Sequence, residues 1–227
     1  MSAAIDLSRQ ARVNAPGSAW LALDLAAVRG LTGLDGIVVP KTEHAEAIEH
    51  AAMASGDLAI VPILETSLGI LHAAAIAHAQ ATVPALLFGA EDLTAEIGVP
   101  RTIDGDELIY PRAQVVLAAT AAGASAVDAV YIDITDLDGL RRDATRARAM
   151  GFAGKMAIHP SQIPVIHDVF SPTTDDVARA RKLVDAFDAA AAAGGDAVVA
   201  IDRQMVDAPV VNRARRVLAM ADAIAKR

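Results

Sequence analysis

The stretch from Asp57 to Leu93, DLAIVPILETSLGILHAAAIAHAQATVPALLFGAEDL, decides the fold. It begins with an apolar run, Asp57–Leu64, and it closes with a second one, Val83–Ala90. Between them, Thr66–Ala79 carries apolar residues at helical spacing. Two apolar runs joined by a crossover of helical length predict a βαβ unit, whose two strands are parallel neighbours.

Acidic residues follow both of these runs. Glu65 comes directly after the first run and Asp92 comes just after the second. Because parallel neighbours lie about 4.8 Å apart and end at the same edge of a sheet, we expect the two carboxylates side by side at the edge where α/β folds hold their chemistry. Mg²⁺ suits one or two such carboxylates. The alternative is a pair of unrelated acids that solvate strand ends; Glu91 ranks second to Asp92 because alternation points it the other way.

The composition excludes several classes of protein. The chain has 227 residues, a net charge of −8 and no cysteine, so it lacks the basic footprint of a nucleic-acid partner and has no disulfide or thiolate chemistry. Thr66–Ala90 contains no charged residue, yet histidine, glutamine and proline interrupt it, and we expect no membrane span there. No signal pattern opens the chain, and the composition fits a cytoplasmic protein.

Six strand-like runs alternate with helical segments. The runs are Ala11–Ala15, Leu34–Lys41, Asp57–Leu64, Val83–Ala90, Val127–Asp133 and Gly154–His159. This rhythm predicts an α/β fold of the (β/α)8 TIM-barrel type, two strands short of closure at the N-terminus. We expect residues 1–170 to form the barrel-type catalytic domain and residues 171–227 to form a C-terminal helical arm or lid.

Six short strings carry a family resemblance: RVNAPG, GIVVPK, ILETSLGI, LLFGAEDL, GKMAIHPSQIPVIHDVF and DRQMVDAPV. In this order, from about Arg12 to the C-terminus, they resemble the citrate lyase β-subunit-like family of the HpcH/HpaI aldolase and malyl-CoA lyase superfamily. Members of that family begin with one strand of the VPG type and a second that ends in DLED, and neither string is present in this sequence.

The resemblance implies a Mg²⁺-dependent carbon–carbon lyase, with Mn²⁺ as an alternative ion. Its substrate would be a 3-hydroxyacyl-CoA-type thioester of the malyl, citramalyl or citryl class, cleaved to acetyl-CoA and a keto acid or formed in reverse. By resemblance, Glu65 and Asp92 hold the metal, Arg12 and Glu65 bind substrate, and Asp207 is a catalytic acid that a neighbouring subunit of a homotrimer or hexamer inserts. The sequence leaves open the acyl group, CoA against an acyl-carrier thioester, and hydrolysis of the released thioester.

Other interpretations remain beside this one. Arg12 could form a structural ion pair, and Asp207 could cap the last helix, with Pro209 in its first turn. A lysine in a barrel can form a Schiff base; Lys155 is expected near the start of its strand, whereas Lys41 is at the catalytic edge but is better read as solvating a strand end. A non-catalytic, metal-binding subunit or remnant of such a lyase is the third possibility.

Overall fold

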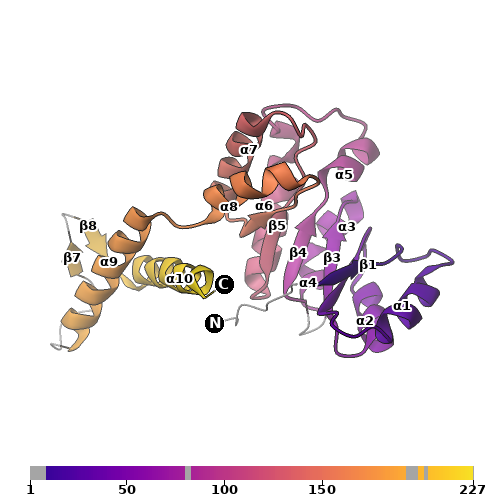
Figure 1. Cartoon of the computed structure of the whole chain (residues 1–227), viewed down its shortest axis with the longest axis horizontal. Coiled ribbons are helices and arrows are strands. Elements are labelled where there is room, and N and C mark those ends of the chain that lie inside the picture. Colours follow the sequence, from indigo (N-terminus) through magenta and orange to yellow (C-terminus); the bar gives the residue numbers. More distant parts are fainter. Residues whose placement is uncertain (1–8, 80–82, 193–198, 202–203, 227) are drawn as a thin grey trace. The chain divides into compact units, whose positions relative to one another are not determined.

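A computed structural model of the chain describes residues 9–79, 83–192, 199–201 and 204–226. The chain divides into two compact units, Met1–Ile166 and His167–Arg227 (Figure 1). The boundary falls within helix α8 (Ile163–Phe170). None of the helices in these described ranges combines the length and the apolar character needed to cross a membrane.

Within the described part of the first unit, six strands form one sheet in chain order, and every neighbouring pair is parallel. The strands are β1 (Gln10–Arg12), β2 (Gly36–Val39), β3 (Ala59–Leu64), β4 (Ala85–Phe88), β5 (Ser125–Asp128) and β6 (Gly154–Lys155). At least one helix connects each strand to the next (Figure 1). This is the repeated β/α unit of a TIM barrel, and the predicted α/β class with a parallel sheet is confirmed as an incomplete barrel.

The connecting helices are α1 (Leu21–Arg29), α2 (Ala45–Ser55), α3 (Ser67–Leu71), α4 (Ala73–Ala77), α5 (Ala90–Ile97), α6 (Ile109–Ala121) and α7 (Leu137–Met150), with 3₁₀ turns η1 (Asp106–Leu108) and η2 (Pro160–Gln162). The single crossover helix expected over Thr66–Ala79 is wrong in one respect, because His72 divides it into α3 and α4. The backbone of His72 leaves the helical region, with φ −93° and ψ 6°. Its Nδ1 lies 2.8 Å from the carbonyl oxygen of Glu43, which ties the break to the neighbouring β2–α2 loop.

Five of the six strands, all except β3, end earlier than the sequence predicted. β5 stops at Asp128 rather than Asp133, and β6 stops at Lys155 rather than His159. Asp128 and Lys155 are register partners, and both side chains turn into a buried charge cluster. β4 ends at Phe88, because Gly89 caps helix α5, which begins at once.

The sheet buries its apolar residues most completely at its centre. All six residues of β3 are buried, so a near-continuous apolar run marks a strand covered on both faces.

A second buried feature is ionic. The Arg112 guanidinium donates to both carboxylate oxygens of Asp128 at 2.9 Å, and it also contacts Asp143. The Lys155 ammonium lies 2.6 Å from each of these two carboxylates. We call these four residues the Arg112 cluster: its two cations, Arg112 and Lys155, balance the two carboxylates of Asp128 and Asp143. The cluster joins β5, β6, α6 and α7.

The second unit contains a helical pair and a small hairpin. In chain order it consists of helix α9 (Thr174–Ala192), strands β7 (Val199–Ile201) and β8 (Gln204–Val206), and helix α10 (Ala208–Ala225). The two strands pair antiparallel. Buried Val206 and Val211 form a core with apolar residues of α9 and α10, namely Leu183, Val184, Ala186, Phe187 and Val210.

Candidate active site

The carboxyl ends of the first four strands carry the candidate residues of the first unit. Arg12 is the last residue of β1, and Glu65 follows β3 directly. Lys41 lies two residues beyond the end of β2. Asp92 was expected at a strand end and lies instead in the first turn of α5, three residues further along the chain than Gly89. Parallel strands end at one edge, so these side chains share the edge where barrel enzymes hold their chemistry.

Glu65 is the buried member of this group, with 6% of its surface exposed. Its Oε1 accepts a hydrogen bond of 2.9 Å from the backbone N–H of Lys41. Burial raises the pKa of the Glu65 carboxyl above its ordinary value; the Lys41 N–H opposes this shift and the charge of Asp92 adds to it. A carboxylate that is poorly solvated and has a second carboxylate near it is stabilised by a cation.

Asp92 is half exposed, and its Oδ1 lies 3.1 Å from the ammonium of Lys41. The positive end of the α5 dipole also favours a carboxylate in this first turn. The neighbouring Glu91 forms an ion pair with Arg101. Both acids lie in the first turn of α5, so the strand alternation on which the ranking of Asp92 above Glu91 rested does not apply there.

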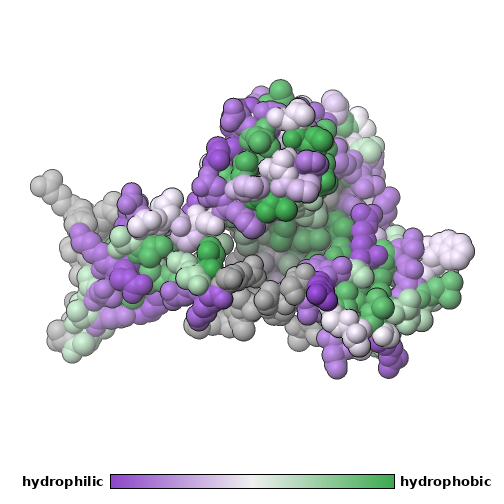
Figure 2. All heavy atoms as spheres, viewed as in Figure 1, coloured by the Kyte–Doolittle hydropathy of each residue, from purple (hydrophilic) through white to green (hydrophobic). Residues whose placement is uncertain are grey.

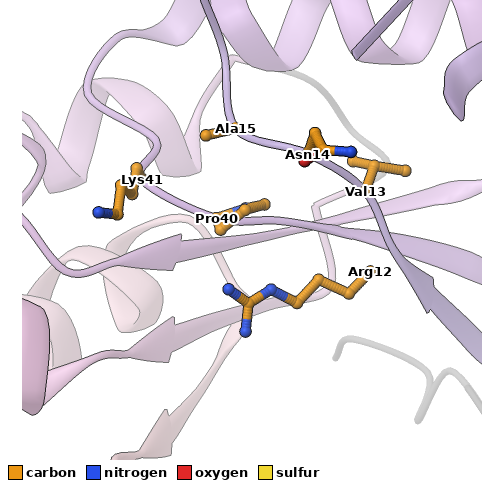
Figure 3. A pocket seen from close by; sticks show the side chains of 6 residues that line it. All are labelled: Arg12, Val13, Asn14, Ala15, Pro40 and Lys41. Atoms are coloured by element: carbon orange, nitrogen blue, oxygen red, sulfur yellow. The ribbon is translucent and has the colours of Figure 1, made fainter. Parts of the chain in front are cut away.

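Arg12 and Lys41 line one pocket of about 370 Å³, together with Val13, Asn14, Ala15 and Pro40. In the view of Figure 3, Pro40 lies between the side chains of Lys41 and Arg12. Within the described residues no carboxylate lies within ion-pairing distance of Arg12, so the structural ion pair considered for it is not formed there. The Arg12 charge still acts on Glu65, whose pKa it lowers slightly against the effect of burial. An uncommitted guanidinium beside two carboxylates can bind an anionic substrate group.

Lys41 is the residue whose importance the sequence did not reveal. It is the non-glycine residue with positive φ in the described chain, at φ 49°, a conformation that costs roughly 1–3 kcal/mol. Its backbone contacts Glu65 and its side chain contacts Asp92. The hydrogen bond and the charge of Asp92 raise the pKa of the Lys41 ammonium. The string VPK at a strand end was the available signal, but it does not encode the backbone turn.

Lys155, the other lysine weighed for a Schiff base, is not near the start of a long strand as expected. It is the last residue of the two-residue strand β6. Its ammonium is buried between Asp128 and Asp143 in the Arg112 cluster. An amine that is buried and paired with two carboxylates is a poor nucleophile, so the geometry gives no support to a Schiff-base role for Lys155.

Asp207 belongs to the second unit. Its Oδ1 accepts a hydrogen bond of 3.2 Å from the backbone N–H of Val210 and caps α10. Pro209 occupies the first turn, as the capping interpretation requires. This contact establishes a structural role for Asp207, and its delivery to the active site of a neighbouring subunit stays a prediction.

The donor set fits a hard divalent cation. Glu65 and Asp92 offer carboxylate oxygens, and Mg²⁺ commonly takes one or two carboxylates and fills its other positions with water and substrate oxygens. A Cβ at Gly89 would occupy the space of the Glu65 carboxylate, since it would lie 2.8 Å from Oε2, so this glycine leaves room for the acid. Among the described residues no group of three or more histidine, cysteine or acidic side chains is arranged so that it could hold a metal ion.

Comparison with known proteins gives a consistent result. Residues 2–160 match the model of the HpcH/HpaI aldolase/citrate lyase family. A citrate lyase subunit beta-like protein of Deinococcus radiodurans is 41% identical over 222 residues, which cover 96% of this chain and 77% of that protein. The mitochondrial citramalyl-CoA lyase of Rattus norvegicus is 35% identical over 173 residues, or 73% of this chain and 51% of that enzyme.

Among solved structures, the fold resembles a crystal structure of protein CitE from Mycobacterium tuberculosis in complex with magnesium, acetoacetate and coenzyme A. The TM-score is 0.77 at 36% identity, and the match covers 94% of this chain and 78% of that chain. The order of the strands, the positions of Glu65 after β3 and Asp92 in the first turn of α5, and the sequence matches all agree with the resemblance seen in the sequence. The chain belongs to the HpcH/HpaI aldolase/citrate lyase family.

Proposed function

We propose that the protein is a Mg²⁺-dependent carbon–carbon lyase that acts on a 3-hydroxyacyl-CoA thioester of the malyl, citramalyl or citryl class. The observation that carries the proposal is the grouping of Glu65 and Asp92 at one sheet edge, where both contact Lys41 beside the Arg12 pocket. The names of the relatives support it: one is a citramalyl-CoA lyase, and the CitE complex contains magnesium and coenzyme A.

Cleavage would break the bond between C2 and C3 of the thioester. The hydroxyl on C3 loses its proton and becomes the carbonyl of a keto acid, while the electron pair of the broken bond forms the enolate of the thioester. That enolate takes up a proton to give acetyl-CoA. The reverse reaction begins when a base removes the same proton from acetyl-CoA.

The residues of this chain have distinct tasks in that reaction. Glu65 and Asp92 would hold the Mg²⁺, which supplies Lewis-acid polarisation of the substrate oxygens when bound. Arg12 would bind a substrate carboxylate or the thioester oxygen and stabilise negative charge that develops there. Manganese would fit the same oxygen ligands.

Asp207 would serve as the base of the condensation direction in a site shared between subunits of a trimer or hexamer. Assembly is also favoured by the surface of the first unit. Figure 2 shows hydrophobic residues on the surface over α1 and α8, and large exposed side chains near these helices include Trp20, Leu23, Ile158 and Ile163. Such apolar surface is commonly covered by a partner.

The test is a panel of thioesters incubated with the protein and Mg²⁺. Malyl-, citramalyl- and citryl-CoA are offered, each beside its acyl-carrier analogue, and acetyl thioester, keto acid and free thiol are measured by mass spectrometry. We expect one CoA thioester to yield equal amounts of acetyl-CoA and keto acid. Free thiol without keto acid would indicate hydrolysis instead, and metal binding without any product would favour a non-catalytic subunit.

A further inference from the structure

Lys41 contacts both candidate metal ligands, through two different groups. Its backbone N–H donates to Oε1 of Glu65 at 2.9 Å, and its ammonium lies 3.1 Å from Oδ1 of Asp92. In this arrangement the ammonium supplies the positive charge that the two neighbouring carboxylates need. A divalent cation bound to Asp92 would supply the same charge at the same oxygen.

The backbone at Lys41 is built for this double contact. The chain turns through φ 49° at this residue, and the next residue, Thr42, fixes the turn on both sides. Thr42 donates from its backbone N–H to the carbonyl oxygen of Ile63 at 3.2 Å and from its Oγ1 to that of Val39 at 3.0 Å. The Lys41 N–H is therefore held towards Glu65 whether or not its side chain moves.

The side chain, in contrast, is free to leave. The Lys41 and Asp92 side chains are 52% and 49% exposed, and a lysine stem of four carbons can carry its ammonium into water. An ion pair this exposed is weak and easily broken. The backbone hydrogen bond from Lys41 to Glu65 is thus held in place by the turn, whereas the ion pair of the Lys41 side chain with Asp92 can be replaced.

We propose that Lys41 is an internal counter-cation, which neutralises Asp92 while the site holds no metal and is displaced from Asp92 when a divalent cation binds. This inference rests on the proposed metal site at Glu65 and Asp92. It adds a competition within the chain: the ammonium keeps the two carboxylates together before metal arrives, and it lowers the affinity of the site for metal. Lys41 is a positioning residue in this account, since it acts on the reaction through the metal ligands.

If Lys41 competes with the metal, removal of its charge should strengthen metal binding. If Lys41 instead assisted metal binding, the same change should weaken it. Mn²⁺ affinity is measured by electron paramagnetic resonance, which counts the free ion, for the whole protein and for Lys41→Met. Methionine keeps the length of the stem and removes the charge. We expect Lys41→Met to bind Mn²⁺ roughly two- to fivefold more tightly, the range that corresponds to loss of an exposed ion pair. The difference should shrink at high salt, which screens exposed charges.

Two further variants separate this effect from others. Lys41→Arg retains a cation at the same position and should bind Mn²⁺ as the unmodified protein does. Lys226→Met removes a charge from the end of α10 and should leave Mn²⁺ affinity unchanged. Equal or weaker binding by Lys41→Met, or an equal gain in Lys226→Met, would overturn the role of Lys41. Absence of Mn²⁺ binding in the unmodified protein would instead contradict the metal site itself.

Discussion

A side chain at Gly89 would collide with Glu65: a Cβ placed there would lie 2.4 Å from the Cβ and 2.8 Å from Oε2 of that residue. Gly89 caps α5 at the end of β4, and its lack of a side chain is what lets the carboxylate of the neighbouring strand pass over it. The glycine of the string LLFGAEDL is therefore a part of the candidate site, although it offers no ligand.

Gly89→Ala should displace Glu65 and weaken the binding of divalent metal. Overpacking of this kind typically costs about 1–3 kcal/mol, and the affected atom is a Cβ close to the backbone, which cannot rotate away. Metal titration of the folded variant, verified by circular dichroism, checks the expectation. Gly30→Ala is the control, because the nearest atom to its added Cβ would be a carbonyl oxygen at an ordinary 3.7 Å. Normal metal affinity in Gly89→Ala would show that Glu65 does not need this space.

The sequence predicted the sheet and the edge of the site because both follow from local patterns. The buried run of β3 is continuous, and an acid closes it, so the sequence alone places Glu65 at a strand end. The sequence also places Asp92 at this edge, but it does not show that Asp92 belongs to helix α5, since an apolar run does not reveal where the following helix begins. The structure resolves this at Gly89, where α5 starts.

Contacts between distant residues could not be predicted in the same way. Arg112 meets Asp128 and Asp143 at separations of 16 and 31 residues, and nothing in a single sequence pairs them. The positive φ of Lys41 was also invisible, because lysine rarely adopts this conformation. Tertiary structure decides both features, and a solvating role for Lys41 is all that the sequence indicates.

The Arg112 cluster should be a major source of stability. Asp128→Asn keeps the shape of the side chain and removes its charge, which leaves the buried cations Arg112 and Lys155 undercompensated. Breaking a buried ion pair from one side costs about 3–5 kcal/mol. Urea unfolding followed by circular dichroism measures the loss. Asp106→Asn, which breaks the exposed pair with Arg146, is the matched control and should cost at most about 1 kcal/mol; equal losses in the two variants would refute the distinction.

Low pH should remove the contribution that Asp143 makes to the unfolding free energy. Burial raises the pKa of Asp143, but the charges of Lys155 and Arg112 outweigh it and hold the pKa below the ordinary 3.8. A carboxyl whose pKa is lowered in the folded state stabilises the protein above its unfolded pKa, and this contribution is lost as the pH falls through the folded pKa. The difference in unfolding free energy between the unmodified protein and Asp143→Asn should thus be constant above about pH 5 and shrink below 3.8. A difference that stays constant down to strong acid would contradict the shift.

The variant Asp207→Asn distinguishes a capping role of Asp207 from a catalytic one. Asparagine caps a helix as well as aspartate does, so Asp207→Asn should keep the bond to the Val210 N–H and the stability of α10. If Asp207 is the base, turnover in the condensation direction should fall by about 10²–10⁴. Normal turnover in the variant would leave Asp207 as a helix cap alone.

Mixing experiments test whether that site is shared between subunits. Asp207→Asn protein and Glu65→Gln protein, each inactive alone, should regain part of the activity after subunit exchange, because some sites would then combine an intact residue from each parent. Light scattering first establishes that an oligomer forms. Exchange that is verified by mass labelling but restores no activity would argue for a site within one subunit.

The most direct measurement is calorimetric titration of Mg²⁺ into the unmodified protein and into Glu65→Gln/Asp92→Asn, with Glu91→Gln as the control. Glu91 is adjacent to Asp92 but pairs with Arg101, so its loss removes an acid without removing a proposed ligand. We predict binding by the unmodified protein and by the control, and no binding by the double variant. Unchanged Mg²⁺ affinity in Glu65→Gln/Asp92→Asn would contradict the metal site on which the proposed lyase depends.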